Sequence, residues 1–254
     1  MKIIFIGSGN LAVNLAKALY RAGHEILQVF SRTAEHADSF AALFECSSTT
    51  CIYDVRPDAD IYIFSLKDSV LERMANCVAE NVQGKLFVHT AGSMPLDVLP
   101  VKRRGVLYPM QTFSKSREVD FSIIPTFIEA ENDDDLILLK ELAESISHSV
   151  YELDSERRRY LHLSAVFCCN FVNHCYRLSE RILKPCDIPF DVMLPLIDET
   201  ARKVHELSPS EAQTGPAIRW DENVIRKHLD LLDEMPDLHQ LYELLSKSIH
   251  NDKQ

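Results

Sequence analysis

The chain has 254 residues, of which 46% are apolar and 26% charged, an ordinary balance for a globular protein that buries one large core or two modest ones. Its net charge of −11 would repel a phosphate backbone, so we expect no nucleic-acid partner. No segment approaches the roughly 18 consecutive apolar residues of a membrane helix, so we expect no membrane partner either.

The cysteines and the N-terminus favour a cytoplasmic protein. Seven cysteines show neither a C-x-x-C pair nor a zinc-like Cys/His spacing, so we predict reduced, mostly buried thiols and no metal site. The opening apolar run has only four residues and feeds directly into a glycine turn, unlike a signal peptide.

The first fourteen residues predict a dinucleotide site. Ile3–Ile6 is a β-branched and aromatic run typical of a buried parallel strand, and Gly7–Ala12 fits the G-x-G-x-x-A fingerprint. Apolar residues recur at helical spacing from Leu11 to Leu19, so a helix N-terminus should face the turn and favour a phosphate. The predicted cofactor contacts in this turn are Gly7, Ser8, Gly9, Asn10 and Leu11.

The end of the second predicted strand, Ile26–Phe30, indicates which dinucleotide binds. In NAD-binding proteins an acidic residue usually ends this strand and holds the ribose hydroxyls. Here the residues are Ser31, Arg32 and Thr33, which can hold a 2′-phosphate and offer no carboxylate to repel it. We therefore predict NADP as the cofactor, with NAD as the alternative, because a solvated Arg32 would be compatible with either.

Further strands alternate with helices up to about residue 150, which predicts a doubly wound sheet, and the seventh strand is expected at Ile123–Glu129. Ligands on such sheets bind beyond the carboxyl ends of the strands, where several loops should converge. Those loops are Gly7–Asn10, Ser31–Thr33, Ser65–Asp68, His89–Ser93 and Tyr108–Thr112. They add Ser65, Leu66 and Ala91 to the predicted cofactor contacts.

The pattern changes from Ser155 onward. Glu156–Leu183 is expected to be one long helix, and further helices are expected at 190–207, 222–233 and 237–249. The predicted fold is α/β, with an N-terminal doubly wound Rossmann-type domain (1–153) followed by an all-α domain (154–254).

Several motifs in this order resemble a known family. They are Lys67-Asp68, His89–Ser93, Tyr108–Phe113, His162, Asn170 and Thr214–Asp221. The chain resembles Rossmann-like proteins that carry a C-terminal helical domain of unknown function 2520. These are similar to the 6-phosphogluconate dehydrogenase, β-hydroxyacid dehydrogenase and pyrroline-5-carboxylate reductase superfamily. The resemblance implies NAD(P)H-dependent redox chemistry and a homodimer formed through the helical domain.

The chain departs from that superfamily at two places. The β-hydroxyacid dehydrogenases carry a proton-transferring Lys on the long helix, whereas here the first Lys of that helix is Lys184 at its far end. Where the family pattern has Arg-Gly-Asp, this chain has Arg219-Trp220-Asp221.

Polar residues in the converging loops and on the predicted helices are the remaining site candidates. Hydride transfer to a carbonyl or imine requires a proton donor, and histidine suits this role near neutral pH. The catalytic candidates are His162, Asn170 and Ser93, the substrate-binding candidates are His89, Gln111 and Arg219, and weaker candidates are Asn173 and His174. Each helical candidate could instead satisfy a helix–helix contact.

The favoured function is an NADP(H)-dependent oxidoreductase that acts on a small carbonyl, imine or hydroxy acid. Because the usual Lys is missing, a non-catalytic NADP-binding sensor or regulator is the alternative. A third possibility is an assembly protein in which the apolar long helix is an interface.

Overall fold

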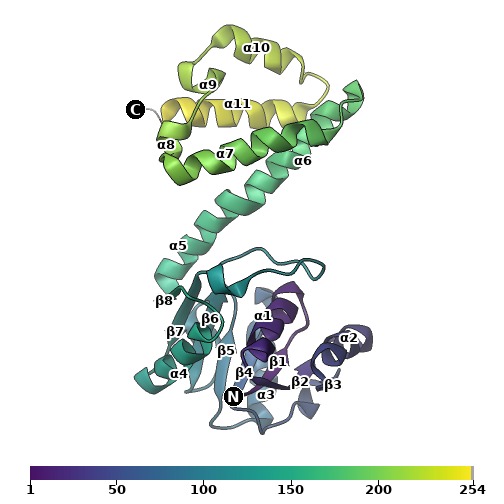
Figure 1. The fold of residues 1–254 in the computed structure, drawn as a ribbon, viewed down its shortest axis with the longest axis vertical. Coiled ribbons are helices and arrows are strands. Elements are labelled where there is room, and N and C mark those ends of the chain that lie inside the picture. Colours follow the sequence, from purple (N-terminus) through teal and green to yellow (C-terminus); the bar gives the residue numbers. More distant parts are fainter. Residues whose placement is uncertain (253–254) are drawn as a thin grey trace. The chain divides into compact units, whose positions relative to one another are not determined.

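A computed structural model describes residues 1–252 (Figure 1). Its eight-stranded sheet has the order β3-β2-β1-β4-β5-β6-β7-β8, and neighbouring strands are parallel except for the antiparallel pair β6 and β7. The strands are β1 (Lys2–Ile6), β2 (Glu25–Phe30), β3 (Ser47–Thr49), β4 (Ile61–Phe64), β5 (Leu86–His89), β6 (Arg104–Pro109), β7 (Thr126–Ala130) and β8 (Val150–Glu152).

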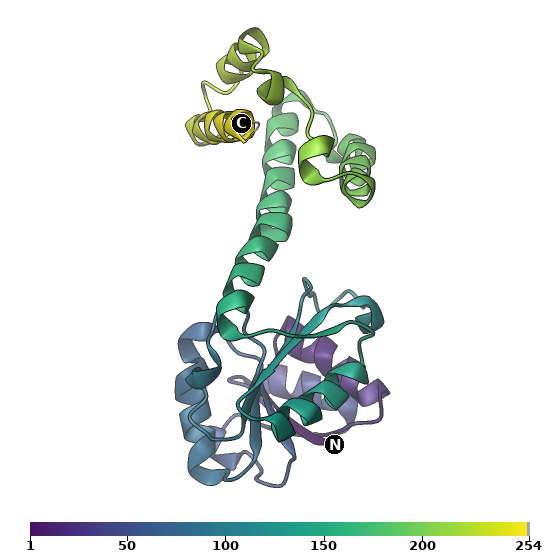
Figure 2. The ribbon, with the colours of Figure 1, turned by 90° about the vertical axis from the view of Figure 1, so that its left-hand side faces the viewer.

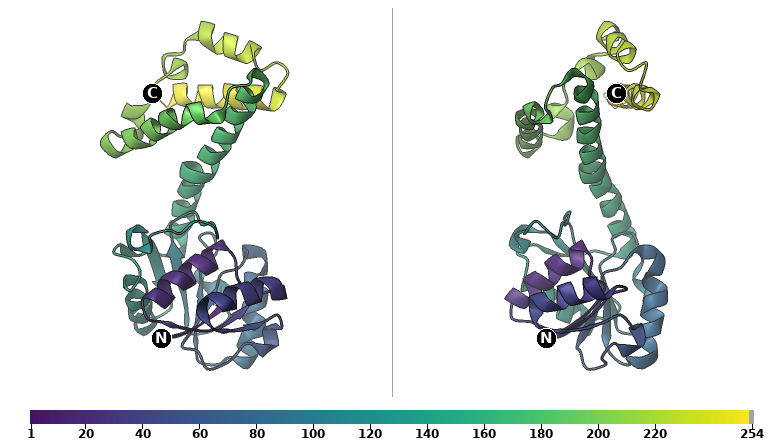
Figure 3. Two further views of the ribbon diagram at one scale, coloured as in Figure 1. Left: turned by 45° about the vertical axis from the view of Figure 1, so that its right-hand side comes forward. Right: turned by 90° about the vertical axis from the view of Figure 1, so that its right-hand side faces the viewer.

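Helices cover both faces of the sheet (Figure 2 and Figure 3). The helices are α1 (Asn10–Arg21), α2 (Ala34–Phe44) and α4 (Asp133–Glu144) on one face, and α3 (Asp68–Asn81) on the other. Alternate residues of β1 explain this arrangement, because Ile3 and Phe5 pack with α1 whereas Ile4 and Ile6 pack with α3. The predicted Rossmann-type doubly wound sheet is confirmed.

The seventh strand differs from its prediction, which began it at Ile123. The segment Phe121–Ile123 forms a 3-10 turn, and the side chain of Asp120 accepts a hydrogen bond from the backbone N–H of Ser122. The backbone N–H of Ser122 therefore bonds a nearby side chain instead of a neighbouring strand, and β7 begins only at Thr126.

The C-terminal part is helical, as predicted. It contains α5 (Ser155–Ala165), α6 (Val172–Leu183), α7 (Leu194–Glu206), α8 (Pro209–Ala212), α9 (Pro216–Arg219), α10 (Glu222–Asp230) and α11 (Pro236–Asn251). The expected single helix from Glu156 to Leu183 is interrupted by a π-helical turn, Val166–Phe171. Such turns arise from a local shift in the hydrogen-bond register and often occur at functional sites.

The chain divides into two compact units, the first spanning Met1–Asn170 and the second starting at Phe171. This division falls within the π-helical turn, whereas the domain boundary predicted at 153/154 lies just before α5. The predicted boundary remains a prediction, and the last two residues of the predicted helical domain, 253 and 254, lie outside the described residues. No helix in residues 1–252 is long and apolar enough to cross a membrane.

Candidate functional site

The turn between β1 and α1 has the geometry of a phosphate cradle. Gly7 has φ +117°, and a Cβ there would lie 2.2 Å from the carbonyl oxygen of Ser65, so only glycine fits. Gly9 precedes α1, no side chain of the described residues caps this helix start, and a Cβ at Gly9 would meet nothing within 4 Å. The first N–H groups of α1 therefore face open space, which fits a pyrophosphate.

The two glycines are expected to respond differently to alanine. Gly7→Ala forces a side chain into left-handed backbone and against Ser65, so it should destabilise the fold by about 3 kcal/mol. Gly9→Ala should cost less than about 1 kcal/mol but should weaken dinucleotide binding, because its methyl group occupies the space above the helix start. Urea unfolding and NADPH titration of both variants check this, and equal stability losses would contradict it.

A cavity of about 520 Å³ lies against this turn. Besides the turn itself, the ends of β2 and β4 contribute Ser31, Thr33, Ser65 and Leu66. Its cationic lining residues are Arg32, Lys67, Arg73 and Lys115, with His36 beside them, and none of the described residues that line it is acidic. In a chain of net charge −11, such a cavity selects an anionic ligand. The residues present fit a dinucleotide that carries an additional phosphate.

A buried hydrogen bond ties the two phosphate-facing segments together. The hydroxyl of Ser8 donates to the hydroxyl of Ser31 at 2.8 Å, and the backbone N–H of Gly7 donates to the carbonyl of Phe30 at 2.9 Å. The glycine turn therefore fixes the end of β2, where the exposed side chains of Arg32 and Thr33 begin.

A second cavity, of about 420 Å³, contains a tyrosine–histidine pair. The Oη atom of Tyr108, at the end of β6, lies 2.9 Å from Nδ1 of His162 on α5. Burial raises the pKa of Tyr108, and the positive charge of Arg158 partly opposes this, so the hydroxyl stays protonated at neutral pH. The pair can therefore hold and deliver a proton within the cavity.

Gly92 is required for this pair. A Cβ on Gly92 would lie 2.6 Å from Nδ1 of His162 and 2.9 Å from Cζ of Tyr108. The loop after β5 can thus approach the imidazole only because residue 92 has no side chain.

The helical segment Leu161–Asn170 contributes most of the residues that line the second cavity. The π-helical turn supplies Cys168, Cys169 and Asn170 as lining residues, one to two turns beyond His162. Gln111 and Thr112, from the segment after β6, line it as well. His162 and Asn170 therefore border the same cavity.

A buried ion pair holds the start of α5. Arg158 is fully buried and pairs with Glu129 of β7, and it donates a 2.6 Å hydrogen bond to the carbonyl of Met94. Glu129 also accepts hydrogen bonds from the backbone and the hydroxyl of Ser155. The first turn of α5 is thus fixed to the sheet, one turn before His162.

His89 is buried at the end of β5, and its Nδ1 accepts a hydrogen bond from the backbone N–H of Ala91 at 3.2 Å. Burial, with a smaller contribution from the charge of Arg158, lowers the pKa of His89 to about 3. His89 is therefore neutral at physiological pH and supports the loop that carries Gly92.

This histidine should make stability depend on pH. The unfolded chain protonates His89 below its ordinary pKa of 6.5, whereas the folded chain resists protonation down to about pH 3. The folded state should therefore lose about 2 kcal/mol on going from about pH 7 to pH 5 through this group. Urea unfolding at the two pH values should show this loss in the wild type and a smaller one in His89→Gln. An equal loss in both proteins would contradict the assignment.

The remaining predicted contacts lie at different places. Leu11 packs partly against the core rather than lining the nucleotide cavity, and Ser93 donates a hydrogen bond to Asp68. Arg219 is exposed on α9 in the second unit, and Asn173 and His174 are exposed on α6. Among residues 1–252, no group of three or more His, Cys, Asp or Glu side chains is placed to hold a metal ion.

Sequence reasoning gave no individual role to several residues that the structure brings to the two cavities. Tyr108 and Lys67 lie in the predicted loops Tyr108–Thr112 and Ser65–Asp68, so their place at the carboxyl edge of the sheet was a usable signal. Arg73 lies in the second turn of α3. No local sequence signal places Lys115 at the nucleotide cavity, because it lies on a loop that is far from the glycine turn in sequence.

Comparisons with known proteins agree with these features. The family model described as "NADP oxidoreductase coenzyme F420-dependent" matches residues 2–92, and the domain of unknown function 2520 matches residues 124–249. A comparison with curated proteins finds no match.

Solved structures extend the comparison. A "putative NADP oxidoreductase" from Bacteroides fragilis is 56% identical, with 98% of each chain covered and a TM-score of 0.94. An imine reductase from Myxococcus stipitatus in complex with NADP⁺ is 13% identical over 99% of this chain and 92% of its own, with a TM-score of 0.70. A pyrroline-5-carboxylate reductase from Coxiella burnetii is 16% identical over 99% and 96%, with a TM-score of 0.57. The last two show likeness of fold alone.

The predicted fold class, a Rossmann-type region followed by a helical region, and the predicted NADP cofactor are confirmed by these matches. The chain belongs to the same family as the "putative NADP oxidoreductase" from Bacteroides fragilis, and in this chain an NADP oxidoreductase match is followed by the domain of unknown function 2520.

Proposed function

We propose that the protein is an NADP(H)-dependent oxidoreductase that acts on a small carbonyl, imine or hydroxy acid. The hydrogen bond between Tyr108 and His162 carries the proposal, because it sets a proton-holding pair in a cavity of its own. The cationic cavity at the glycine turn supports NADP as the cofactor. The first cavity is built from loops at the carboxyl ends of parallel strands, where ligands of such sheets bind. The second cavity lies between the end of β6 and the helical segment Leu161–Asn170.

Four residues of the second cavity have proposed roles. When bound, NADPH supplies the hydride. The hydroxyl of Tyr108 donates the proton that neutralises the developing charge on the substrate, and His162 replaces that proton through its 2.9 Å hydrogen bond. Asn170 and Gln111 offer amide groups that can orient a carbonyl or an imine.

The remaining site candidates keep supporting roles in this proposal. His89, which is buried and neutral, supports the loop above the sheet rather than contacting substrate. Ser93, which bonds Asp68, is a candidate for holding the carboxamide end of the cofactor together with Ala91. Arg219 is a candidate for binding a substrate carboxylate.

The experiment is a turnover assay with NADPH and a panel of imines, keto acids and aldehydes. Turnover is measured as the decrease in NADPH absorbance. Turnover of any panel class supports the oxidoreductase and identifies its substrate class. Tight NADPH binding without turnover across the panel would instead favour a non-catalytic sensor. Failure to bind either NADPH or NADH would overturn both functions.

The second unit supports a homodimer formed through the helical domain. No residue of α6 or α7 is buried, although both helices have an apolar face. Large apolar side chains of this unit that are at least 38% exposed are Phe171, Val172, Ile182, Ile188, Val192, Leu194, Leu196, Val204, Leu207, Leu231, Leu244 and Leu245. An apolar surface spread over several helices is typical of a permanent interface, and symmetric homodimers are the commonest such assemblies.

The mass in solution tests this arrangement. Light scattering after gel filtration should give twice the mass of one chain, and Leu196→Asp with Val204→Asp should shift it to one chain or to aggregates. Glu199→Gln on the same helix is the matched control and should leave the dimer intact. A monomeric wild type would contradict the proposal.

The prediction that the cysteines are mostly buried is wrong, because four of the seven are exposed and three are half-buried. All seven are free thiols, which supports a cytoplasmic location as a further proposal.

A further inference from the structure

One segment of the first unit borders both cavities. It consists of residues 110–120 and joins β6 to the 3-10 turn before β7; we call it the strap. Met110, Gln111 and Thr112 at its start line the cavity of Tyr108 and His162, and Lys115 in its middle lines the cavity of the glycine turn. In Figure 1 the strap is the teal loop that passes over α1.

Side chains of α1 and of the core hold the part of the strap that precedes Lys115. Asn14 is 5% exposed, and its amide donates to the carbonyl of Asn10 at 2.8 Å and to the carbonyl of Ser114 at 3.1 Å. Phe113 stacks on Phe121 with ring centroids 5.6 Å apart. Because the buried Asn14 amide donates one of its two N–H groups to the carbonyl of Ser114, it fixes the path of the strap at that residue.

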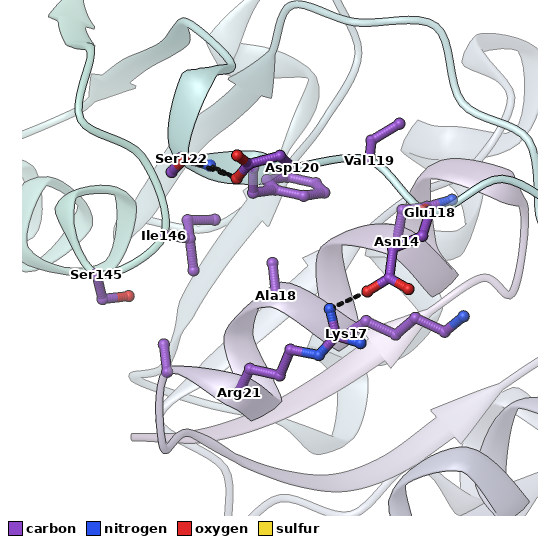
Figure 4. Close-up of a pocket in the computed structure, with 12 residues that line it drawn as sticks. Asn14, Lys17, Ala18, Arg21, Glu118, Val119, Asp120, Ser122, Ser145 and Ile146 are labelled. Atoms are coloured by element: carbon purple, nitrogen blue, oxygen red, sulfur yellow. Dashed lines mark hydrogen bonds and ion pairs between the residues drawn. The ribbon is translucent and has the colours of Figure 1, made fainter.

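The far side of the strap is held more weakly. Glu118 forms an exposed ion pair with Arg21 of α1, across the groove of about 540 Å³ drawn in Figure 4. Exposed pairs contribute little to stability. The tip, residues 114–118, is exposed throughout and carries the sequence Ser-Lys-Ser-Arg-Glu. The strap thus has a fixed entry and an exposed tip whose Lys115 is directed to the nucleotide cavity.

We propose that Lys115 is a cofactor-binding residue that contacts a phosphate of the dinucleotide, and that this contact fixes the strap and with it one wall of the second cavity. The inference rests on the proposed nucleotide site, but it requires no turnover. Arg32 and Arg73 enter that cavity from the sheet and from α3, so Lys115 supplies a positive charge from an independent element. Because Met110–Thr112 belong to the same strap, bound cofactor completes the cavity that receives the substrate.

Titration of Lys115→Gln with NADPH and with NADH tests the contact. Loss of a charge-assisted hydrogen bond should weaken binding about tenfold. A loss confined to NADPH assigns Lys115 to the 2′-phosphate, whereas an equal loss with both dinucleotides assigns it to the pyrophosphate. Arg117→Gln, two residues along the exposed tip and outside both cavities, is the charge-matched control and should bind like the wild type. Wild-type affinity of Lys115→Gln for both dinucleotides would overturn the proposal.

Hydrogen exchange measured by mass spectrometry tests the strap. NADPH should slow exchange in peptides that cover residues 110–120 of the wild type and of Arg117→Gln, and should slow it much less in Lys115→Gln at saturating NADPH. Unchanged exchange in the strap, together with protection at the glycine turn, would overturn this inference and leave the proposed function standing. Absence of protection at the glycine turn as well would mean that the nucleotide site itself is wrong.

Discussion

Replacing Tyr108 with phenylalanine is expected to lower kcat for imine or carbonyl reduction by about 10²–10³-fold while leaving NADPH affinity unchanged. The variant keeps the aromatic ring that packs against His162 and loses only the hydroxyl that lies 2.9 Å from Nδ1. Because that hydroxyl is the proposed proton donor, the loss should appear in the chemical step. Steady-state kinetics together with NADPH titration measure the two effects separately.

His162→Gln completes the comparison. If tyrosine and histidine act as one unit, this variant should lose a similar factor in kcat, and the double variant should be little worse than either single variant. Tyr20→Phe, a conservative exchange at an exposed tyrosine of α1, is the control and should retain wild-type turnover. Independent, multiplying losses would mean that the two groups do not share a proton.

The second large effect concerns the choice of dinucleotide. Arg32→Ala is expected to weaken NADPH binding by about 10–100-fold and to change NADH binding less than about threefold, because a charge-assisted hydrogen bond to the 2′-phosphate is lost only with NADPH. Arg32 is exposed at the end of β2 and lines the cationic cavity. Titration of both dinucleotides at low and high salt measures the difference, which should shrink as salt rises.

The control for Arg32 is Arg56→Ala. Arg56 is an exposed arginine of the same unit that pairs with Asp58, outside the nucleotide cavity. This variant should bind both dinucleotides as the wild type does. If Arg32→Ala weakened NADH as strongly as NADPH, the arginine would contact a group common to both, and the preference for NADP would need another explanation.

The nucleotide half of the site could be predicted from sequence because its signals are local. The run Ile3–Ile6, the glycines of the next six residues and the helical spacing after Leu11 specify strand, turn and helix within one βα unit. Arg32 follows the next strand directly, so its position at the same edge follows from the parallel order of the sheet.

The cavity of Tyr108 and His162 depends on distant contacts that the sequence does not encode locally. Tyr108 and His162 are 54 residues apart, and their meeting requires both the antiparallel β6–β7 pair and the buried Arg158–Glu129 pair that fixes α5. In the sequence, Arg158 is the middle of an arginine triplet that looks solvated, yet its side chain is fully buried. The π-helical turn depends on hydrogen-bond register, which apolar spacing does not reveal.

Deuterium transfer from NADPH labelled at C4 tests the central claim most directly. Mass spectrometry of the products from the imine, keto acid and aldehyde panel should find one product that carries a single deuterium on its former carbonyl or imine carbon. After the same reaction time, the Tyr108→Phe variant should have formed about 10²–10³-fold less of this deuterated product than the wild type. Full NADPH occupancy with no deuterium in any product of the panel would contradict the account.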